Sequence, residues 1–593
     1  MDIFSYPIDH NTILRKKKSI KKELLNRPGL KKIKIAILGG STTSEVTKVL
    51  ELFLLNGGYS PIFYESEYNR FYEDAVFDNP GLDDFCPDLI YIHSSVVNIS
   101  SFPDFSDSEE QVLALILEHT AKFASIWSAL EKYNCPIIQN NFDYPVNRRL
   151  GNLDAYDFHG VTYFVNELNR SFAASARDRK NLFLQDINYL SARVGLSKWF
   201  DHSLWFQAKY SISLIAIPDL CLNLFNIINA LTGSTKKCLV LDLDNTCWGG
   251  VIGDDGVDGI CIGHDSPIGE AFSAFQSYAL SLKKRGISLA VSSKNDISNA
   301  EAGFSHPDMT LKLEDITLLK ANWNQKHLNI ADIASEINIG LDSLVFVDDN
   351  PAERELVYSQ LPDVEVPDVG DDVTLYIDYL DRSGYFESIS LSSEDLSRSK
   401  YYSDNAQRET AQQTFDSYGD FLLSLDMTAE IKTFSPVYLD RITQLTNKTN
   451  QFNLTTKRYS LGEISLIANS DEHISLYGKL SDKFGDNGLV SVIVGSIKDS
   501  TCTIDLWLMS CRVLKREMEY AMLDELTRQC IAYDVSQIIG IYLPSARNDM
   551  VSSLYEDLGF SLIETNDSGS KWFLNIAKPS EMNKYIKVEN AHD

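Results

Sequence analysis

The stretch CLVLDLD, residues 238–244, decides the fold of this chain. Four apolar residues from Cys238 to Leu241 are typical of a strand that is buried on both faces. Asp242 and Asp244 follow at the end of this strand. Because ligands of open α/β sheets gather at the carboxyl ends of the strands, we expect these two carboxylates to lie at a ligand-binding edge.

The sequence downstream repeats the alternation of strand and helix. Apolar spacing predicts helices over residues 269–285 and 326–337, and buried strands over ISLAVSS (287–293) and SLVFVDD (343–349). Two of the three predicted strands end in acidic residues. This order predicts a parallel α/β sheet within residues 233–386.

The pair Asp242 and Asp244 suits phosphoryl chemistry. Two carboxylates separated by one residue can approach a hard divalent cation, which prefers oxygen ligands. One carboxylate can act as the nucleophile while the other works as acid or base. Taken alone, the pair could also be a turn with two solvated acids.

Three more features follow in the expected order. Ser293 ends a predicted strand, where its hydroxyl can hold a phosphoryl oxygen. Lys326 can balance the negative charge of the nucleophile and the transferred group. Asp348 and Asp349 end the last strand and can complete a magnesium shell. Each has a structural alternative, namely a helix cap, a surface lysine and an acidic turn, but together they favour a phosphotransferase.

This segment resembles the haloacid dehalogenase (HAD) superfamily. The resemblance implies an aspartyl-phosphate intermediate that water hydrolyses, with Mg²⁺ as cofactor. It assigns the nucleophile to Asp242, the general acid/base to Asp244, the first-motif threonine to Thr246, the second-motif hydroxyl to Ser293, the third-motif lysine to Lys326, and the metal ligands to Asp242, Asp244, Asp348 and Asp349. The interval from Cys247 to Val291 is too short for a cap domain.

The strings LDLDNTCWGGVIGDDG, AVSSKND, KANWNQK and LDSLVFVDDNPAERE resemble more narrowly the FkbH-like branch, an uncapped subfamily (IIIC). This resemblance implies an enzyme that takes the glyceryl unit of 1,3-bisphosphoglycerate, removes phosphate, and passes the acyl group to the phosphopantetheine of an acyl carrier protein. An acyl phosphate is an activated donor, so thioester formation is downhill.

The position of a catalytic cysteine is less clear in this sequence. Many relatives carry a cysteine where this chain has Ser292. Cys247 and Cys511 are the remaining candidates for a thiolate that carries the acyl group, and each is alternatively a buried structural cysteine.

Residues 31–232 should form a separate α/β domain, because KIKIAILGGS (32–41) combines a buried strand with a glycine turn before a helix. Further strands are expected at residues 88–93 and 136–139. The GGSTT segment resembles the first block of SGNH-type esterases, with Ser41 as nucleophile. The nominated partners Asn141, Asp201 and His202 stand in poorly matching contexts. We therefore expect the fold without hydrolase activity, serving as a docking surface.

A helical linker is predicted over residues 387–427, followed by a GNAT-like α+β domain over 428–593. Strands are expected at 475–480, 490–497 and 501–509, with a helix at 515–529. Coenzyme-A-binding relatives place glycines where this chain has Lys515 and Glu517, so binding of free acetyl-coenzyme A is not expected. A groove for the pantetheine arm of a carrier remains a hypothesis.

Composition limits the partners. The net charge of −29 argues against nucleic acid and anionic membranes as partners. Residues 1–30 form a basic helix whose Arg15, Lys16, Lys17, Lys18, Lys21 and Lys22 could dock an acidic protein or simply be solvated. Nine scattered cysteines and no apolar signal core predict a cytoplasmic protein. Residues 211–230 are expected to form a buried helix.

Two other functions stay open at this point. One is plain hydrolysis of a phosphomonoester, which the serine at position 292 favours. The other is an acyltransferase or scaffold whose GNAT-like domain carries the function while the HAD-like domain is structural.

Overall fold

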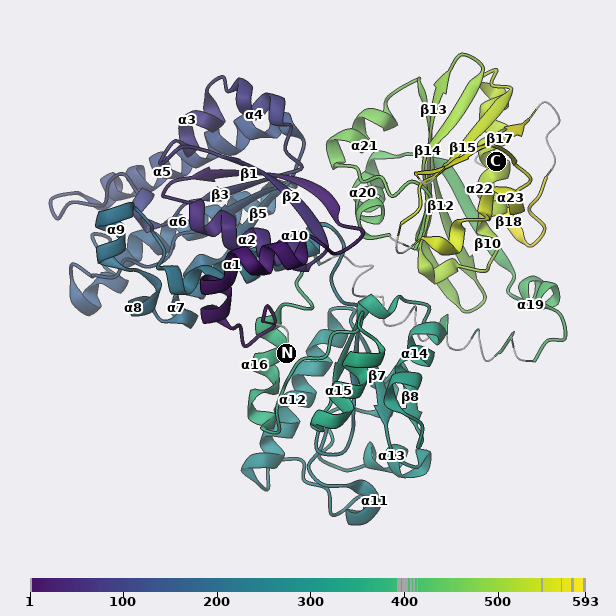
Figure 1. Cartoon of the computed structure of the whole chain (residues 1–593), viewed down its shortest axis with the longest axis horizontal. Helices are drawn as coiled ribbons and strands as arrows, with labels where there is room; N and C mark the ends of the chain where they lie inside the picture. The colour runs from purple at the N-terminus through teal and green to yellow at the C-terminus, as the bar shows by residue number, and fades with distance from the viewer. Residues whose placement is uncertain are drawn as a thin grey trace. The chain divides into compact units, whose positions relative to one another are not determined.

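The computed structural model describes residues 3–589, except for short gaps at 392–395, 397–400, 402–403, 406–407, 409–410, 413, 450, 546–547, 567 and 577–580. The chain divides into two compact units, Met1–Leu231 and Thr232–Asp593 (Figure 1). This division falls beside the predicted boundary at residue 232. The predicted linker 387–427 lies partly outside the described residues, and α19 (Tyr418–Ser424) occupies its end.

The first unit contains a five-stranded parallel sheet in the order β2-β1-β3-β4-β5. The predicted strands at 88–93 and 136–139 are confirmed as β3 and β4. Two further strands, β2 and β5, form the edges and were not predicted. The strands are β1 (Lys31–Gly39), β2 (Tyr59–Glu65), β3 (Leu89–His93), β4 (Ile137–Asn140) and β5 (Leu182–Gln185).

Helices cover both faces of this sheet (Figure 1). On one face α10 packs beside α2, and α1 packs on α2; on the other, α5 contacts α3 and α6. Aromatic side chains such as Phe123, Trp127 and Phe172 fill the layer beneath α5 and α6. The helices are α1 (His10–Leu24), α2 (Ser44–Asn56), α3 (Phe71–Val76), α4 (Pro80–Phe85), α5 (Glu109–Leu130), α6 (Val161–Asp178), α7 (Ile187–Val194), α8 (Leu196–Trp199), α9 (His202–Ala208) and α10 (Ile217–Leu231).

Judged by length and composition alone, one segment of the described chain, Leu214–Leu231, could cross a membrane. Of this stretch, 61% is buried inside the structure. The segment contains α10, whose apolar side packs against α2. This burial is typical of a core helix.

The second unit begins with residues 232–386, which we call the middle domain. Its parallel sheet has the order β8-β7-β6-β9, and the predicted strands and helices are confirmed with small shifts of their ends. The elements are β6 (Cys238–Leu241), α11 (Ile252–Asp255), α12 (Pro267–Lys284), β7 (Ser288–Ser293), α13 (Ile297–Gly303), β8 (Leu318–Ala321), α14 (Lys326–Glu336), β9 (Leu344–Val347), α15 (Pro351–Gln360) and α16 (Tyr376–Ser383).

The C-terminal domain, residues 418–589, is built on a mixed sheet in the order β16-β17-β15-β14-β13-β12-β10-β18, with β11 paired to β14. The three predicted strands and the helix are present. The elements are α19, β10 (Met427–Thr433), α20 (Leu439–Lys448), β11 (Phe452–Asn453), α21 (Leu461–Ala468), β12 (His473–Asp482), β13 (Gly485–Lys498), β14 (Thr501–Met509), α22 (Met518–Ala532), β15 (Gln537–Tyr542), α23 (Leu554–Asp557), β16 (Ser561–Asn566), β17 (Gly569–Asn575) and β18 (Ile586–Glu589).

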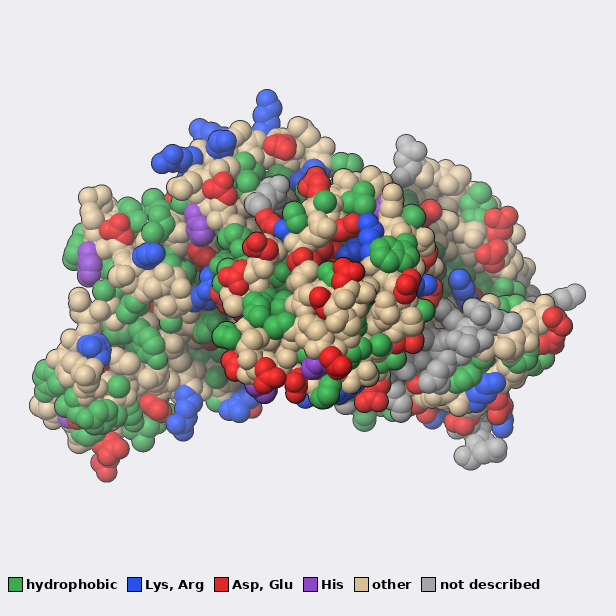
Figure 2. All heavy atoms as spheres, turned by 90° about the horizontal axis from the view of Figure 1, so that it is seen from below, with side chains coloured by type: hydrophobic (Ala, Val, Ile, Leu, Met, Phe, Trp, Pro, Cys, Tyr) green, Lys and Arg blue, Asp and Glu red, His purple; other side chains and the backbone are tan. Residues whose placement is uncertain are grey.

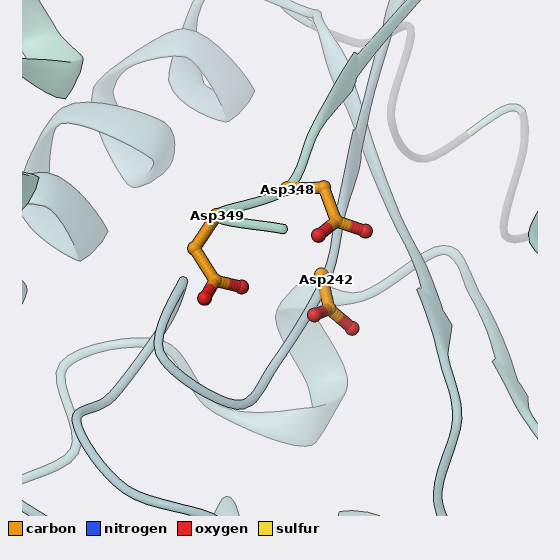
Figure 3. A group of neighbouring side chains, drawn as sticks. All are labelled: Asp242, Asp348 and Asp349. Carbon is orange, nitrogen blue, oxygen red and sulfur yellow. The ribbon is translucent and has the colours of Figure 1, made fainter. Parts of the chain in front are cut away.

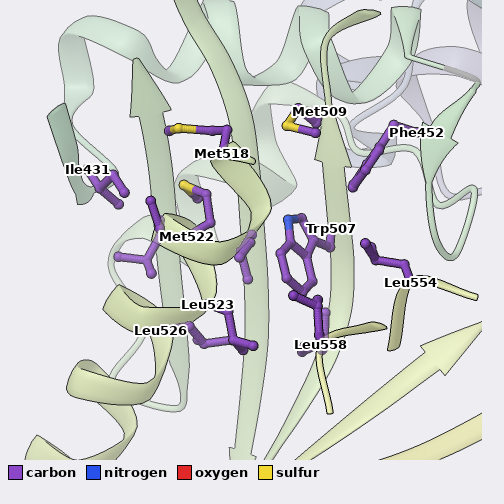
Figure 4. Packing of buried hydrophobic residues seen from close by; sticks show 14 of the residues in the cluster. Ile431, Phe452, Trp507, Met509, Met518, Met522, Leu523, Leu526, Leu554 and Leu558 are labelled. Carbon is purple, nitrogen blue, oxygen red and sulfur yellow. The ribbon is translucent and has the colours of Figure 1, made fainter. Parts of the chain in front are cut away.

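The larger hydrophobic cluster of this domain lies between the sheet and α22, and a second one lies under α20 and α21. Figure 4 shows Met518, Met522 and Leu526 of α22 lying against the strands, and Trp507 of β14 near Leu554 and Leu558. The buried apolar side chains of two long strands and one helix thus form one continuous cluster. Burial of this kind is the main stabilising contribution to a domain of this size.

The carboxyl of Glu519 gives the C-terminal domain a pH-dependent stability. Burial raises its pKa to about 7, and Oε2 accepts no hydrogen bond from the described residues. Because the folded-state pKa lies above the ordinary value of 4.5, this group's contribution is fully present below about pH 4.5 and is lost as the pH rises through 7.

We therefore expect Glu519→Gln to raise the melting temperature of the C-terminal domain at pH 8 by about 5 °C, and to leave it unchanged at pH 4.5. Calorimetry at the two pH values measures this difference. The exposed Glu556→Gln is the matched control in the same domain. Equal effects of Glu519→Gln at both pH values would contradict the prediction.

Candidate active site

The acidic residues meet at the carboxyl edge of the middle-domain sheet. Strands β6 and β9 are parallel neighbours with Leu241 opposite Val347. The next residue of each strand, Asp242 and Asp348, therefore emerges side by side, and the Asp242 amide donates to the Val347 carbonyl at 3.0 Å.

Three carboxylates converge at this edge. One oxygen from each of Asp242, Asp348 and Asp349 lies within 4.8 Å of the others, and Figure 3 shows the three groups turned toward a common space. Lys326, the first residue of α14, places Nζ 3.0 Å from Asp242 Oδ1 and 2.5 Å from Asp348 Oδ2.

The charges at this edge are strongly coupled. Burial raises the pKa of Asp242 to about 6, while Lys326 opposes this shift and Asp348 adds to it. Burial also raises the pKa of Asp348 and of Asp349. Although burial opposes it, the two carboxylates together raise the pKa of Lys326, which stays an ammonium. One buried cation thus faces three carboxylates, and the site carries an excess of negative charge.

These residues fit a magnesium ion. The donor set consists only of oxygen atoms, as Mg²⁺ prefers. Asp242 Oδ1 is buried, and the Lys326 ammonium at 3.0 Å is the cation that faces it within the described site. Because this one ammonium stands against three carboxylates, the cluster keeps an excess of negative charge and is suited to coordinate a further cation.

Asp244 lies apart from this cluster. Its Oδ1 accepts hydrogen bonds from Trp248 Nε1 at 3.0 Å and from the Ile252 amide at 3.1 Å, and its Oδ2 accepts from Asn295 Nδ2 at 2.9 Å. The structure therefore brings together three of the four predicted metal ligands. The Asp244 side chain is instead oriented by three donors, as a general acid/base requires.

Thr246 and Ser293 occupy the predicted positions beside the cluster. The buried Thr246 hydroxyl accepts from the Asp349 amide at 3.1 Å and lies 3.4 Å from Asp349 Oδ1. Ser293 ends β7, and its Oγ accepts from Asn295 Nδ2 at 3.4 Å. Thr246 thus orients a carboxylate, and Ser293 shares its amide partner with Asp244.

The cysteines do not join the site as predicted. Cys247 is buried, its thiol donates to the Asp242 carbonyl at 3.1 Å, and burial raises its pKa well above the ordinary value. A thiol held protonated in this way is a poor nucleophile, so the prediction for Cys247 is not supported. Cys511 follows β14 in the C-terminal domain, half-buried, and its carbonyl accepts from Asn338 Nδ2 at 2.8 Å.

No separate domain covers the site from within its own chain segment. Between Cys247 and Val291, all of which the structure describes, the helices are α11 and α12. The cluster therefore faces a substrate without a lid from this interval, in line with the predicted lack of a cap.

One residue that contacts the site was not predicted. Arg354 of α15 is buried and donates from Nη1 to the carbonyls of Asp348 and Asp349 at 2.8 and 2.7 Å, while Nη2 bonds Asp368 at 2.8 Å. Arg354 therefore fixes the backbone of two metal-ligand candidates.

We expect Arg354→Met to raise the Mg²⁺ concentration for half-maximal activity about 10-fold, because residues behind the ligands orient them. The melting-temperature rise on adding Mg²⁺ should shrink in parallel. Arg354→Lys should recover part of the affinity, and Arg170→Met, at a surface arginine with 81% side-chain exposure, is the control. An unchanged Mg²⁺ dependence would contradict the prediction.

The N-terminal unit does not assemble the nominated esterase residues. Ser41 Oγ bonds Ser211 Oγ at 2.9 Å, and no histidine of the described chain hydrogen-bonds to Ser41. Asn141 donates to Asp186 at 2.8 Å. Asp201 caps α9 through the Leu204 amide, while the His202 ring lies edge-on to Phe200.

In the C-terminal domain a third segment lies between the ends of β14 and β15. These strands pair over residues 501–504 and 537–540. Beyond them the segment 452–454 bridges both strands, because the Leu454 amide donates to the Trp507 carbonyl at 3.1 Å and the Leu543 amide donates to the Leu454 carbonyl at 2.8 Å. The groove for a pantetheine arm stays a hypothesis. Lys515 and Glu517 adopt φ angles of 65° and 60°, which glycine favours.

Comparisons with known proteins bear on this arrangement. A family model described as FkbH, N-terminal domain, matches residues 34–229. The chain also matches the N-terminal part of the protein BF1531 from Bacteroides fragilis, which contains a phosphatase domain complexed with Mg. Identity is 33% over 63% of this chain and 99% of that chain, with a TM-score of 0.59. The chain belongs to the FkbH-like family of HAD proteins. As an FkbH-like protein it is an enzyme of the HAD phosphatase type, and its cofactor is Mg²⁺.

Other matches of this FkbH-like protein are weaker. It matches the ribosomal-protein-S18-alanine N-acetyltransferase from Escherichia coli with 13% identity over 27% of this chain and 100% of that chain, at a TM-score of 0.21. That score supports no argument, and the GNAT-like and SGNH-like folds stay predictions. The comparison with curated proteins found no match.

Proposed function

We propose that this FkbH-like enzyme dephosphorylates 1,3-bisphosphoglycerate and loads the glyceryl unit onto the phosphopantetheine of an acyl carrier protein in the cytoplasm. The observation that carries the phosphate chemistry is the convergence of Asp242, Asp348 and Asp349 around one buried ammonium, that of Lys326. The substrate and the carrier rest on the family resemblance.

In the phosphatase half, a carboxylate oxygen of Asp242 attacks phosphorus and the bond from phosphorus to the ester oxygen breaks. Asp244 gives its proton to the leaving alkoxide. Water then attacks the aspartyl phosphorus while Asp244 takes a proton, which releases inorganic phosphate and restores Asp242. Lys326 holds the nucleophile in place. Bound Mg²⁺ would be held by Asp242, Asp348 and Asp349 and would offset the negative charge of the phosphoryl oxygens.

In the transfer half, the carrier thiolate attacks the carbonyl carbon of the acyl phosphate. The bond from that carbon to the phosphate oxygen breaks, and phosphate leaves with the electron pair. Cys247 is buried and its thiol donates to the Asp242 carbonyl, which disfavours it as the group that carries the acyl unit between these steps. Direct attack by the carrier thiol requires no enzyme cysteine, and Cys511 is the alternative.

A second candidate function is hydrolysis of a phosphomonoester without acyl transfer. Ser292, at the position where relatives carry a cysteine, and the burial of Cys247 favour it. In this case phosphate would be released and no acyl group would reach a carrier.

One experiment separates these functions. The purified protein is incubated with Mg²⁺, 1,3-bisphosphoglycerate and a phosphopantetheinylated carrier, and the intact mass of the carrier is measured with the released phosphate. A carrier that gains a glyceryl group supports the proposal. Phosphate release beyond the uncatalysed rate without this gain supports the second candidate, and no release at all contradicts both.

A further inference from the structure

Contacts with α2 fix the orientation of α1 about its own axis. Ile13, Ile20 and Leu24 are buried on the side that meets α2. Beside this apolar line, Lys17 pairs with Glu45 at 2.5 Å and Lys21 pairs with Glu51 at 2.7 Å. Two of the six basic residues of α1 are therefore paired with α2, and these contacts determine which side of α1 faces outward.

The outward side carries Arg15, Lys18 and Lys22, which we call the α1 basic stripe. Lys18 and Lys22, four residues apart, lie on one face of the helix. Arg15 precedes them across a kink at Lys16, and all three side chains are exposed. Within the described chain these three side chains form no ion pair, and the exposed Lys16 and Glu23 add one charge of each sign to α1.

The stripe is positively charged, whereas the formal net charge of the whole chain is −29. Figure 2 shows acidic side chains spread over much of one face of the molecule, in keeping with this net charge. Salt screens charges beyond about 8 Å at physiological ionic strength. A compact partner that touches the stripe therefore meets mainly positive charge, whereas an extended polyanion meets acidic surface as well.

We propose that the α1 basic stripe docks an acidic protein, namely the carrier that accepts the acyl unit. The identity of this partner rests on the proposed function. The stripe offers three cations to carboxylates on a compact partner surface. A membrane is the less suitable partner, because the apolar side of α1 is buried against α2 and none remains for insertion.

The test compares two triple variants of the full chain with the same change in net charge. The stripe variant combines Arg15→Glu, Lys18→Glu and Lys22→Glu. The control combines Lys198→Glu, Lys284→Glu and Lys498→Glu, three exposed lysines outside α1. Carrier loading is followed by intact mass at several carrier and salt concentrations, and phosphate release from p-nitrophenyl phosphate, a phosphomonoester, is measured alongside.

We expect the stripe variant to raise the KM for the carrier about 10-fold and to flatten the salt dependence of this KM, with phosphate release from p-nitrophenyl phosphate unchanged. The control should change the KM less than 2-fold, as expected for scattered surface charges. Equal changes in both variants, or none, would overturn the inference. A neutral variant with glutamine at the three stripe positions should lie between wild type and the reversal.

Binding separates this inference from the proposed function. If the wild type loads no carrier, the proposed function fails, and binding of a fluorescent acidic carrier is measured directly. Binding that the stripe variant loses supports the docking surface. No binding by the wild type, or tighter binding of anionic vesicles that the stripe variant loses, overturns it.

Discussion

Asp242→Asn should lower kcat for hydrolysis of p-nitrophenyl phosphate, a phosphomonoester, by about 10⁴-fold or more, because the variant lacks the nucleophilic oxygen. The fold should persist, since asparagine has the same shape and loses only one buried negative charge. The carboxylates of Asp348 and Asp349 remain, so Mg²⁺ should still raise the melting temperature, although less than in the wild type.

The readout that identifies the nucleophile is covalent. Acid-quenched wild-type enzyme should yield a phosphorylated peptide that contains Asp242, and the variant should not. Asp363→Asn, at an exposed aspartate of the same domain, is the matched control. A variant whose activity stays within 10-fold of wild type would assign the nucleophile to another residue.

Lys326→Met should also abolish activity, by about 10³-fold, since the only ammonium that contacts both Asp242 and Asp348 in the described site is lost. In addition it should destabilise the metal-free protein by about 3–5 kcal/mol, because two buried carboxylates lose their counter-charge. Added Mg²⁺ supplies that charge and should restore much of the stability.

The diagnostic observation is therefore the dependence of the melting temperature on Mg²⁺, which should be steeper in Lys326→Met than in wild type. Lys320→Met, at a lysine whose partner Glu336 is part-exposed, serves as the control in the same domain. A Lys326→Met protein as stable as wild type without Mg²⁺ would mean that the carboxylates are protonated and that the ammonium is dispensable.

Strands β6, β7 and β9 of the middle domain could be predicted from sequence because they are short, fully buried and followed by polar residues. The edge strand β8 was not predicted, because most of its residues are only half-buried. The edge strand β2 was missed for a physical reason. It contains Pro61, and its residues are only partly buried, so neither a buried run nor a strict alternation appears in the sequence. Strand β11, with two residues, is defined only by its partner β14.

The site could be predicted only as a set of residue types. Sequence spacing places Asp244 near the metal, but its orientation depends on Asn295 and Trp248, which lie on other parts of the fold. The role of Arg354 depends on the turn after β9, which brings two carbonyls to one guanidinium. The sequence also does not show that Cys247 is buried with its thiol bonded to a carbonyl.

The segment 452–454 has a consequence for how a thiol-bearing ligand could use the C-terminal domain. An extended ligand joins a sheet by supplying the amide and carbonyl groups that a neighbouring strand lacks. Here Leu454 already satisfies Trp507 on one side and Leu543 on the other. A long flexible cofactor could bind between β14 and β15 only if it displaced the segment 452–454. Affinity for such a cofactor should therefore be measurable only in a variant in which this segment is shortened.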